Sequence, residues 1–162
     1  LMESVRTEFL ELFPFVVEAY MSANFPLAAG LTFSLNLILG SLVYITLLSL
    51  IIPFGGIMMG CVRAVGWGLL LAPTSPELAW TMVPHSITLI LEGQGYILAM
   101  FATYIHWKGV IRPKSIGEER RLKAYFTGIK KTANIYVLVA IVLAIAAIYE
   151  AFEVIYIVGN LR

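Results

Sequence analysis

The sequence predicts an all-α membrane protein, a polytopic bundle of about four transmembrane helices. Hydrophobic residues make up 60% of the chain, charged residues only 13%, and the mean hydropathy is +0.88. A soluble domain is roughly half apolar and a quarter charged. A soluble globule of 162 residues could not cover this much apolar surface, so the expected solvent is a lipid bilayer.

The charge and the cysteine count exclude other classes of protein. The formal net charge is +1, which argues against a nucleic-acid partner. The single cysteine, Cys61, excludes an intramolecular disulfide framework and a multi-cysteine metal site.

Four hydrophobic stretches are long enough for a transmembrane helix, which needs about 20 apolar residues. Within one membrane domain, 1–162, they cover residues 27–52, 53–72, 80–107 and 132–158. Asn24 and Pro26 precede the first stretch, as a helix cap and a residue favoured in the first turn. Pro53 predicts a tight turn between the first two spans. One kinked helix is the alternative, although it would be too long for a single span.

The basic residues predict the orientation. Eight of the eleven lysines and arginines lie between the third and fourth spans: Lys108, Arg112, Lys114, Arg120, Arg121, Lys123, Lys130 and Lys131. The positive-inside rule places this loop, 108–131, in the cytoplasm. The C-terminal end at Arg162 and the acidic N-terminal segment would then lie outside the cell membrane. An external N-terminus predicts a further hydrophobic helix upstream of Leu1.

Two helices are expected to lie at the membrane surface. In 1–24, apolar residues at helical spacing oppose glutamates, which predicts an amphipathic helix at the outer interface with a kink near Pro14. In the basic loop, Ser115 and Glu118 have capping-box spacing, and an apolar stripe including Leu122 and Phe126 follows. These features predict a short basic cytoplasmic helix on anionic headgroups. Alternatively, the loop only sets topology.

Ionisable residues inside spans are costly and usually have a partner or a function. Arg63 and Glu92 both lie near the membrane midplane, by a rise of about 1.5 Å per residue. A direct ion pair between them is geometrically possible. Such a pair could have a packing role only.

His85, Glu92, Ala99 and His106 are seven residues apart and share one face of the third span. A proton or cation path would need polar groups at such spacing, whereas two interface histidines are the simpler interpretation. Seven residues of helix span about 10 Å, too far for one shared metal ion. No catalytic motif is present, so we expect no enzyme activity, cofactor or metal.

The outer end of the fourth span carries Glu150 and Glu153 among aromatic residues. We interpret this segment as a solvated interfacial belt. A protonated His85 could reach either glutamate from the start of the third span.

Small residues predict a packing seam. Gly56, Gly60, Ala64 and Gly68 repeat every four residues in the second span, and Gly93, Gly95 and Ala99 form a matching groove on the third. Such stripes allow close approach of two helix backbones. The seam could lie inside one protomer or between protomers.

The order of several motifs resembles the stage II sporulation protein M family of membrane proteins. The matching residues are Asn36 with Gly40, the segment Gly55–Gly60, the Pro84–His85 pair, and a carboxylate, Glu92, in the following hydrophobic stretch. The family has glycine directly after the histidine and glutamate four residues after it, where this chain has Ser86 and Leu89. The resemblance implies a helical membrane bundle that acts as a scaffold for partner proteins.

Two functions therefore remain. The first is a non-enzymatic scaffold or assembly subunit that binds membrane or extracytoplasmic proteins, including a second copy of itself. The alternative is a transport or channel component in which Asn36, Arg63, His85 and Glu92 line a polar path. A scaffold should bury these residues dry and paired, whereas a transporter should place them around a hydrated cavity.

Overall fold

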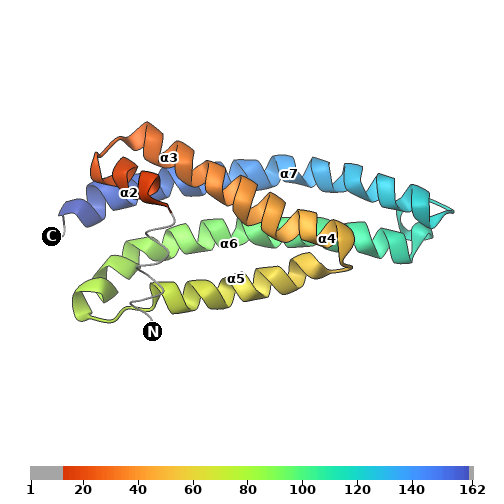
Figure 1. Cartoon of the computed structure of the whole chain (residues 1–162), viewed down its shortest axis with the longest axis horizontal. Helices are drawn as coiled ribbons and strands as arrows, with labels where there is room; N and C mark the ends of the chain where they lie inside the picture. Colours follow the sequence, from red (N-terminus) through yellow and green to blue (C-terminus); the bar gives the residue numbers. More distant parts are fainter. Residues whose placement is uncertain (1–12, 161–162) are drawn as a thin grey trace.

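The computed structural model describes residues 13–160, and every regular element in that range is helical. The predictions for residues 1–12 and for Arg162 lie outside the described residues. In residues 13–160, four long helical segments run antiparallel along one axis (Figure 1). The first joins α3 (Phe25–Ser34), the π-helical η1 (Leu35–Leu47) and α4 (Leu48–Ile51), and the others are α5 (Gly55–Leu71), α6 (Pro76–Ile111) and α7 (Arg121–Phe152).

Shorter elements complete the bundle. Helix α2 (Pro14–Met21) precedes α3, and a 3₁₀ turn, η2 (Pro113–Ile116), lies between α6 and α7. Beyond α7 the chain continues through a second π-helical segment, η3 (Glu153–Ile157), and a 3₁₀ turn, η4 (Val158–Asn160). Helix α2 packs beside α3 and α7 at the end of the bundle opposite the basic loop (Figure 1).

Local sequence signals account for the helix ends. The side chain of Asn24 accepts a hydrogen bond from the backbone N–H of Leu27 at 3.3 Å, so the helix cap predicted at Asn24 is confirmed. Ser75 caps α6 in the same way, with Pro76 next in the first turn. Between α4 and α5 the chain reverses at Phe54, which has a φ of 58°. The reversal excludes one kinked helix over the first two hydrophobic stretches.

Within residues 13–160, three helical segments are long and apolar enough to cross a membrane: Phe25–Ile51, Leu78–Ile111 and Pro113–Ile157. Helix α5 is apolar as well, but its 17 residues make it shorter. The second predicted span, 53–72, is therefore shortened, because Pro53 and Phe54 belong to the turn.

The basic loop differs from the prediction. Residues 121–131 are the first turns of the continuous helix α7 and form no separate helix. Ala124 and Gly128 are buried there, whereas Leu122 and Phe126 of the expected stripe are exposed. No capping box forms, because Ser115 lies inside η2 and α7 begins only after Arg120; Glu118 accepts a hydrogen bond from Thr127 Oγ1 at 2.8 Å. Because Ala124 and Gly128 are small, α7 packs closely against α6 through them, and they form the inner face of α7 at this point.

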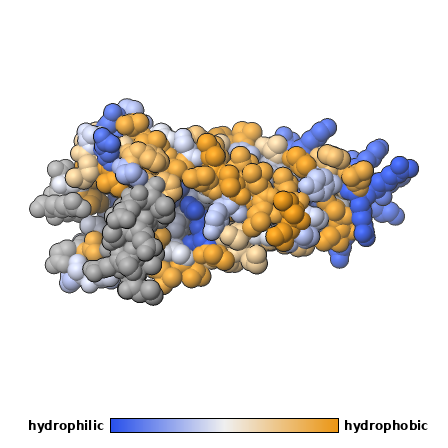
Figure 2. Space-filling view, in the orientation of Figure 1, coloured by the Kyte–Doolittle hydropathy of each residue, from blue (hydrophilic) through white to orange (hydrophobic). Residues whose placement is uncertain are grey.

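The apolar interior is narrow and the exterior is broadly apolar. Ile45, Tyr96, Ala99, Val139 and Leu143 form a buried cluster that joins η1, α6 and α7. Large apolar side chains are exposed along all four long segments, and Figure 2 shows them as a wide hydrophobic band. The hydrophilic end of the same view carries the turn between α6 and α7 (Figures 1 and 2). This distribution fits a protein surrounded by lipid.

The predicted seam is divided between two interfaces. A Cβ atom on Gly56 would lie 2.8 Å from Thr103 Oγ1 of α6, and one on Gly60 would meet the side chain of Met100.

Gly95 instead lies against Leu143 of α7, so the expected groove on α6 does not receive α5. Ala64 and Gly68 are exposed, and a Cβ atom on Gly68 would meet nothing within 4 Å.

Candidate functional site

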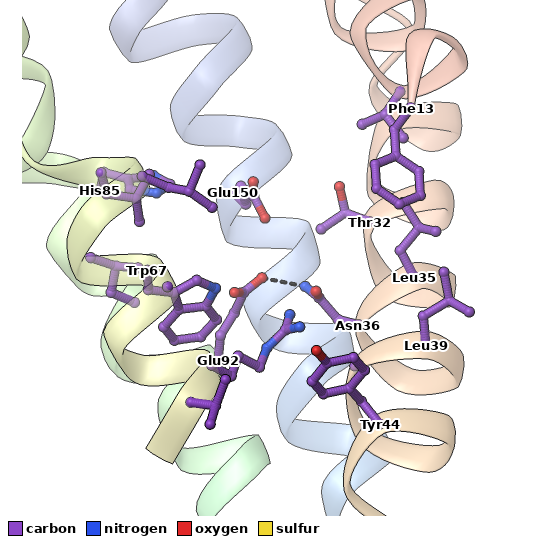
Figure 3. Close-up of a pocket in the computed structure, with 18 residues that line it drawn as sticks. Phe13, Thr32, Leu35, Asn36, Leu39, Tyr44, Trp67, His85, Glu92 and Glu150 are labelled. Atoms are coloured by element: carbon purple, nitrogen blue, oxygen red, sulfur yellow. Dashed lines mark hydrogen bonds between the residues drawn. The ribbon is translucent and has the colours of Figure 1, made fainter. Parts of the chain in front are cut away.

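A cavity of about 640 Å³ lies among α3–η1, α5, α6 and α7. Leucine, valine and aromatic side chains line most of its wall, including Leu39, Tyr44 and Trp67 (Figure 3). Its polar lining consists of Thr32, Asn36, Arg63, His85, Glu92 and Glu150. These include all four residues that the sequence predicted as intramembrane polar candidates. Each of the four helical segments around the cavity contributes at least one of the six polar side chains.

Arg63 and Glu92 are joined by a relay of neutral groups. Arg63 Nη2 donates to the hydroxyl of Tyr96 at 2.7 Å, and this hydroxyl donates to Asn36 Oδ1 at 2.8 Å. The amide nitrogen of Asn36 in turn donates to Glu92 Oε1 (Figure 3). No nitrogen of the Arg63 guanidinium lies within 4 Å of an oxygen of the Glu92 carboxylate. The direct ion pair considered from sequence is therefore not formed.

Aromatic rings hold the guanidinium in place. The Cζ atom of Arg63 lies 4.4 Å from the ring centroid of Tyr96 and 5.3 Å from that of Trp67. Cation–π contacts of this kind stabilise a positive charge by about 0.5–2 kcal/mol, more when it is removed from water. The arrangement keeps a cation at the cavity wall without a contacting carboxylate.

Gly40 makes room for this cluster. A Cβ atom at Gly40 would lie 2.7 Å from the Tyr96 hydroxyl and 3.2 Å from Arg63 Nη2. Gly40 and Asn36 both lie in η1, and π-helical segments are rare and occur frequently at functional sites. Asn36 and Gly40, which the sequence pattern paired, thus serve the same cluster in two ways. Asn36 supplies hydrogen bonds, and Gly40 leaves space for Tyr96 and Arg63 because it has no side chain.

His85 ties α6 to the end of α7. Its Nδ1 lies 3.2 Å from Glu153 Oε2, which also accepts a hydrogen bond from Thr88 Oγ1 at 2.8 Å. Next to this group, the hydroxyl of Tyr149 donates to the carbonyl oxygen of Pro84 at 3.3 Å. Of the two glutamates within expected reach of His85, the structure selects Glu153.

Glu150 and Glu153 do not belong to a solvated belt. Glu153 is only 1% exposed, and Glu150 lines the cavity together with Glu92. The belt interpretation was wrong because Glu153 is buried in η3 and Glu150 of α7 faces the cavity. A signal was present in the sequence, since Val139, Leu143, Ala146, Glu150 and Glu153 follow one another at spacings of four and three.

The four residues of α6 that are seven apart have different surroundings: His85 and Glu92 line the cavity, whereas Ala99 and His106 pack against α7. Ala99 belongs to the cluster shared with α7, and His106 packs against Gly128 and the ring of Tyr125, 4.7 Å away. His106 is 1% exposed and lies outside the cavity lining. His106 is therefore packed between α6 and α7, whereas His85 lines the cavity. No group of three or more potential metal ligands occurs in residues 13–160.

No family model, no curated protein and no solved structure matches this chain. The resemblance to stage II sporulation protein M therefore rests on the sequence motifs alone.

Proposed function

We propose that this protein is a multi-pass membrane transport component that binds a small solute in the cavity among its helices. The observation that carries the proposal is the convergence of Asn36, Arg63, His85 and Glu92 on a cavity of about 640 Å³. Polar and ionised groups within a bilayer are expensive, and they commonly mark solute or ion paths. The volume is typical of a small-molecule site.

A scaffold of the stage II sporulation protein M type is the second candidate. It is supported by the pairing of the polar groups, since Glu92 and Glu153 both accept hydrogen bonds. Pairing alone, however, does not require a cavity beside the paired groups. Because close packing would have filled this space in a purely structural layer, transport is the function that the geometry favours.

The proposed topology has four spans, with the basic loop in the cytoplasm and the C-terminus outside. It is supported by the antiparallel course of α5, whose 17 residues extend about 25 Å, near the lower limit for a span. Phe13, Leu70 and Leu71 line the cavity and lie toward the end opposite the basic loop. In this orientation the cavity is nearer to the outer surface.

Two glycines on α5 allow a matched test of hydration. Gly66 lines the cavity, Gly68 does not, and a Cβ atom at either position would meet nothing within 4 Å. In a Cys61→Ser background, which contains no other cysteine, Gly66→Cys and Gly68→Cys are made separately. We expect a membrane-impermeant thiol reagent added outside intact cells to modify Gly66→Cys much faster than Gly68→Cys.

The other outcomes are equally informative. Equal protection of both cysteines would indicate a dry interior and would favour the scaffold. Modification of Gly66→Cys only in inverted vesicles would reverse the proposed orientation and leave the hydrated cavity intact.

A further inference from the structure

Among residues 13–160, the ionisable groups around the cavity do not balance. Three carboxyl groups, Glu92, Glu150 and Glu153, face two basic groups, Arg63 and His85, even with the imidazole protonated. His85 is taken by Glu153 at 3.2 Å, and Arg63 is linked to Glu92 through Tyr96 and Asn36. One carboxyl group is left over. An uncompensated charge at this depth costs several kcal/mol, so the excess must be neutralised.

Glu150 is the carboxyl group without a basic partner. Within residues 13–160, no lysine, arginine or histidine nitrogen lies within 4 Å of its oxygens. Its charged neighbours are Glu92 and Glu153, and the phenol of Tyr20 on α2 also faces this group. From η1 the neighbouring side chain is the neutral Asn36, and α5 contributes Arg63, whose charge acts on Glu92.

Glu150 lies beside Glu92, and two ionised carboxylates next to each other in an apolar surrounding would repel. Glu92 accepts a hydrogen bond from the Asn36 amide and is linked to the Arg63 guanidinium through Asn36 and Tyr96, so its negative charge has partners. The proton therefore resides on Glu150, where it neutralises the excess carboxyl group.

We propose that the cavity binds a hydrophobic organic cation, which pairs with Glu150 and displaces its proton. The inference rests on the proposed function, since it needs an accessible cavity. Leucine side chains and the rings of Tyr44 and Trp67 supply the apolar and aromatic wall that such a cation prefers (Figure 3). The opposite choice, an organic anion on Arg63, is disfavoured because Glu92 and Glu150 lie on the same cavity.

The exchange is balanced in charge and atoms. The Glu150 carboxyl O–H bond breaks, the proton leaves to water, and the cation takes its place beside the carboxylate. The total charge of the cavity is unchanged, so neither state leaves an unpaired charge in the bilayer. A proton and a cation thus compete for one site, which would couple their movements in opposite directions.

The test uses two probes of the same shape and opposite charge, tetraphenylphosphonium and tetraphenylborate. Binding to the purified full chain in lipid nanodiscs is measured by calorimetry in two buffers of different ionisation enthalpy. We expect tetraphenylphosphonium to bind with release of about one proton. In Glu150→Gln the proton release should vanish and affinity should fall at least about tenfold. Glu119→Gln, an exposed carboxyl group near the basic turn, is the matched control and should leave both unchanged.

The outcomes separate the inference from the function on which it rests. Cation binding without proton release, or tighter binding of tetraphenylborate, overturns the exchange site but keeps a ligand-binding cavity. Binding of neither probe by the folded wild-type protein argues against the cavity as a binding site and therefore against the proposed function. The proton count on the wild-type chain decides the inference even if Glu150→Gln does not fold.

Discussion

The two halves of α5 use the same residue type in opposite ways. In the first half, Gly56 meets Thr103 and the backbone of Ile45, and Gly60 meets Met100. In the second half, a Cβ atom on Gly66 or Gly68 would touch nothing within 4 Å. Glycine therefore brings helices together near the basic end and leaves space open toward the other end. We call the end with the basic turn the closed end, and the end that contains the cavity of about 640 Å³ the hollow end.

Different interactions hold the two ends. At the closed end, Trp107 Nε1 donates to the carbonyl of Ser49, and the Tyr125 hydroxyl donates to that of Leu50 at 3.1 Å. These bonds satisfy carbonyl groups that the end of α4 would otherwise leave unpaired. At the hollow end, charged and polar side chains such as His85 and Glu153 join the helices across the cavity wall. Close packing dominates one half and polar ties dominate the other.

The largest expected effect comes from breaking a polar tie at the hollow end. His85→Ala leaves Glu153 buried with only Thr88 as a partner, so we expect a loss of about 3 kcal/mol in the free energy of unfolding. Reversible unfolding in mixed micelles measures this change. The double variant with Glu153→Ala should cost less than the sum of the single variants. Fully additive costs would mean that the tie contributes nothing to stability.

The next effect concerns the closed end. Gly56→Ala places a methyl group 2.9 Å from the carbonyl oxygen of Ile45, which cannot move without the backbone. We expect a destabilisation of about 2 kcal/mol, typical of overpacking. The same unfolding assay applies. A neutral Gly56→Ala would show that the closed end is looser than the structure indicates.

A smaller effect is expected between Arg63 and Glu92. A double-mutant cycle with Arg63→Met and Glu92→Leu should give a coupling of about 1 kcal/mol, because Tyr96 and Asn36 separate the two charges. Repeating the cycle in Tyr96→Phe should reduce the coupling toward zero, because the relay is cut at the hydroxyl. Coupling of about 3 kcal/mol or more would instead indicate a direct pair.

The smallest effect sharpens the contrast within α5. Gly66→Ala and Gly68→Ala should each stabilise the protein by about 0.5–1 kcal/mol, because alanine restricts the unfolded chain and meets no obstacle here. Only Gly66→Ala adds a methyl group to the cavity lining, so it alone should weaken binding of tetraphenylphosphonium. Identical binding by both variants would place the ligand elsewhere.

Composition and local pattern were sufficient for much of the architecture. The excess of apolar residues predicted a helical membrane protein, and the caps at Asn24 and the turn near Pro53 were predicted from neighbouring residues. The four polar candidates were found because an ionisable or amide group stands out in an apolar stretch. Such signals are carried by composition and short spacing, and no other part of the chain is needed to interpret them.

The relations between helices were decided only by the tertiary structure. Sequence gives the depth of a residue along its helix, at about 1.5 Å per residue, but not the rotation of one helix against another. For this reason the inward position of Glu150 and Glu153 was missed, and Gly95 was assigned to the wrong neighbour. The cavity is space that side chains from four separate segments fail to fill, so no single segment encodes it. Its existence depends on the packing of the whole bundle.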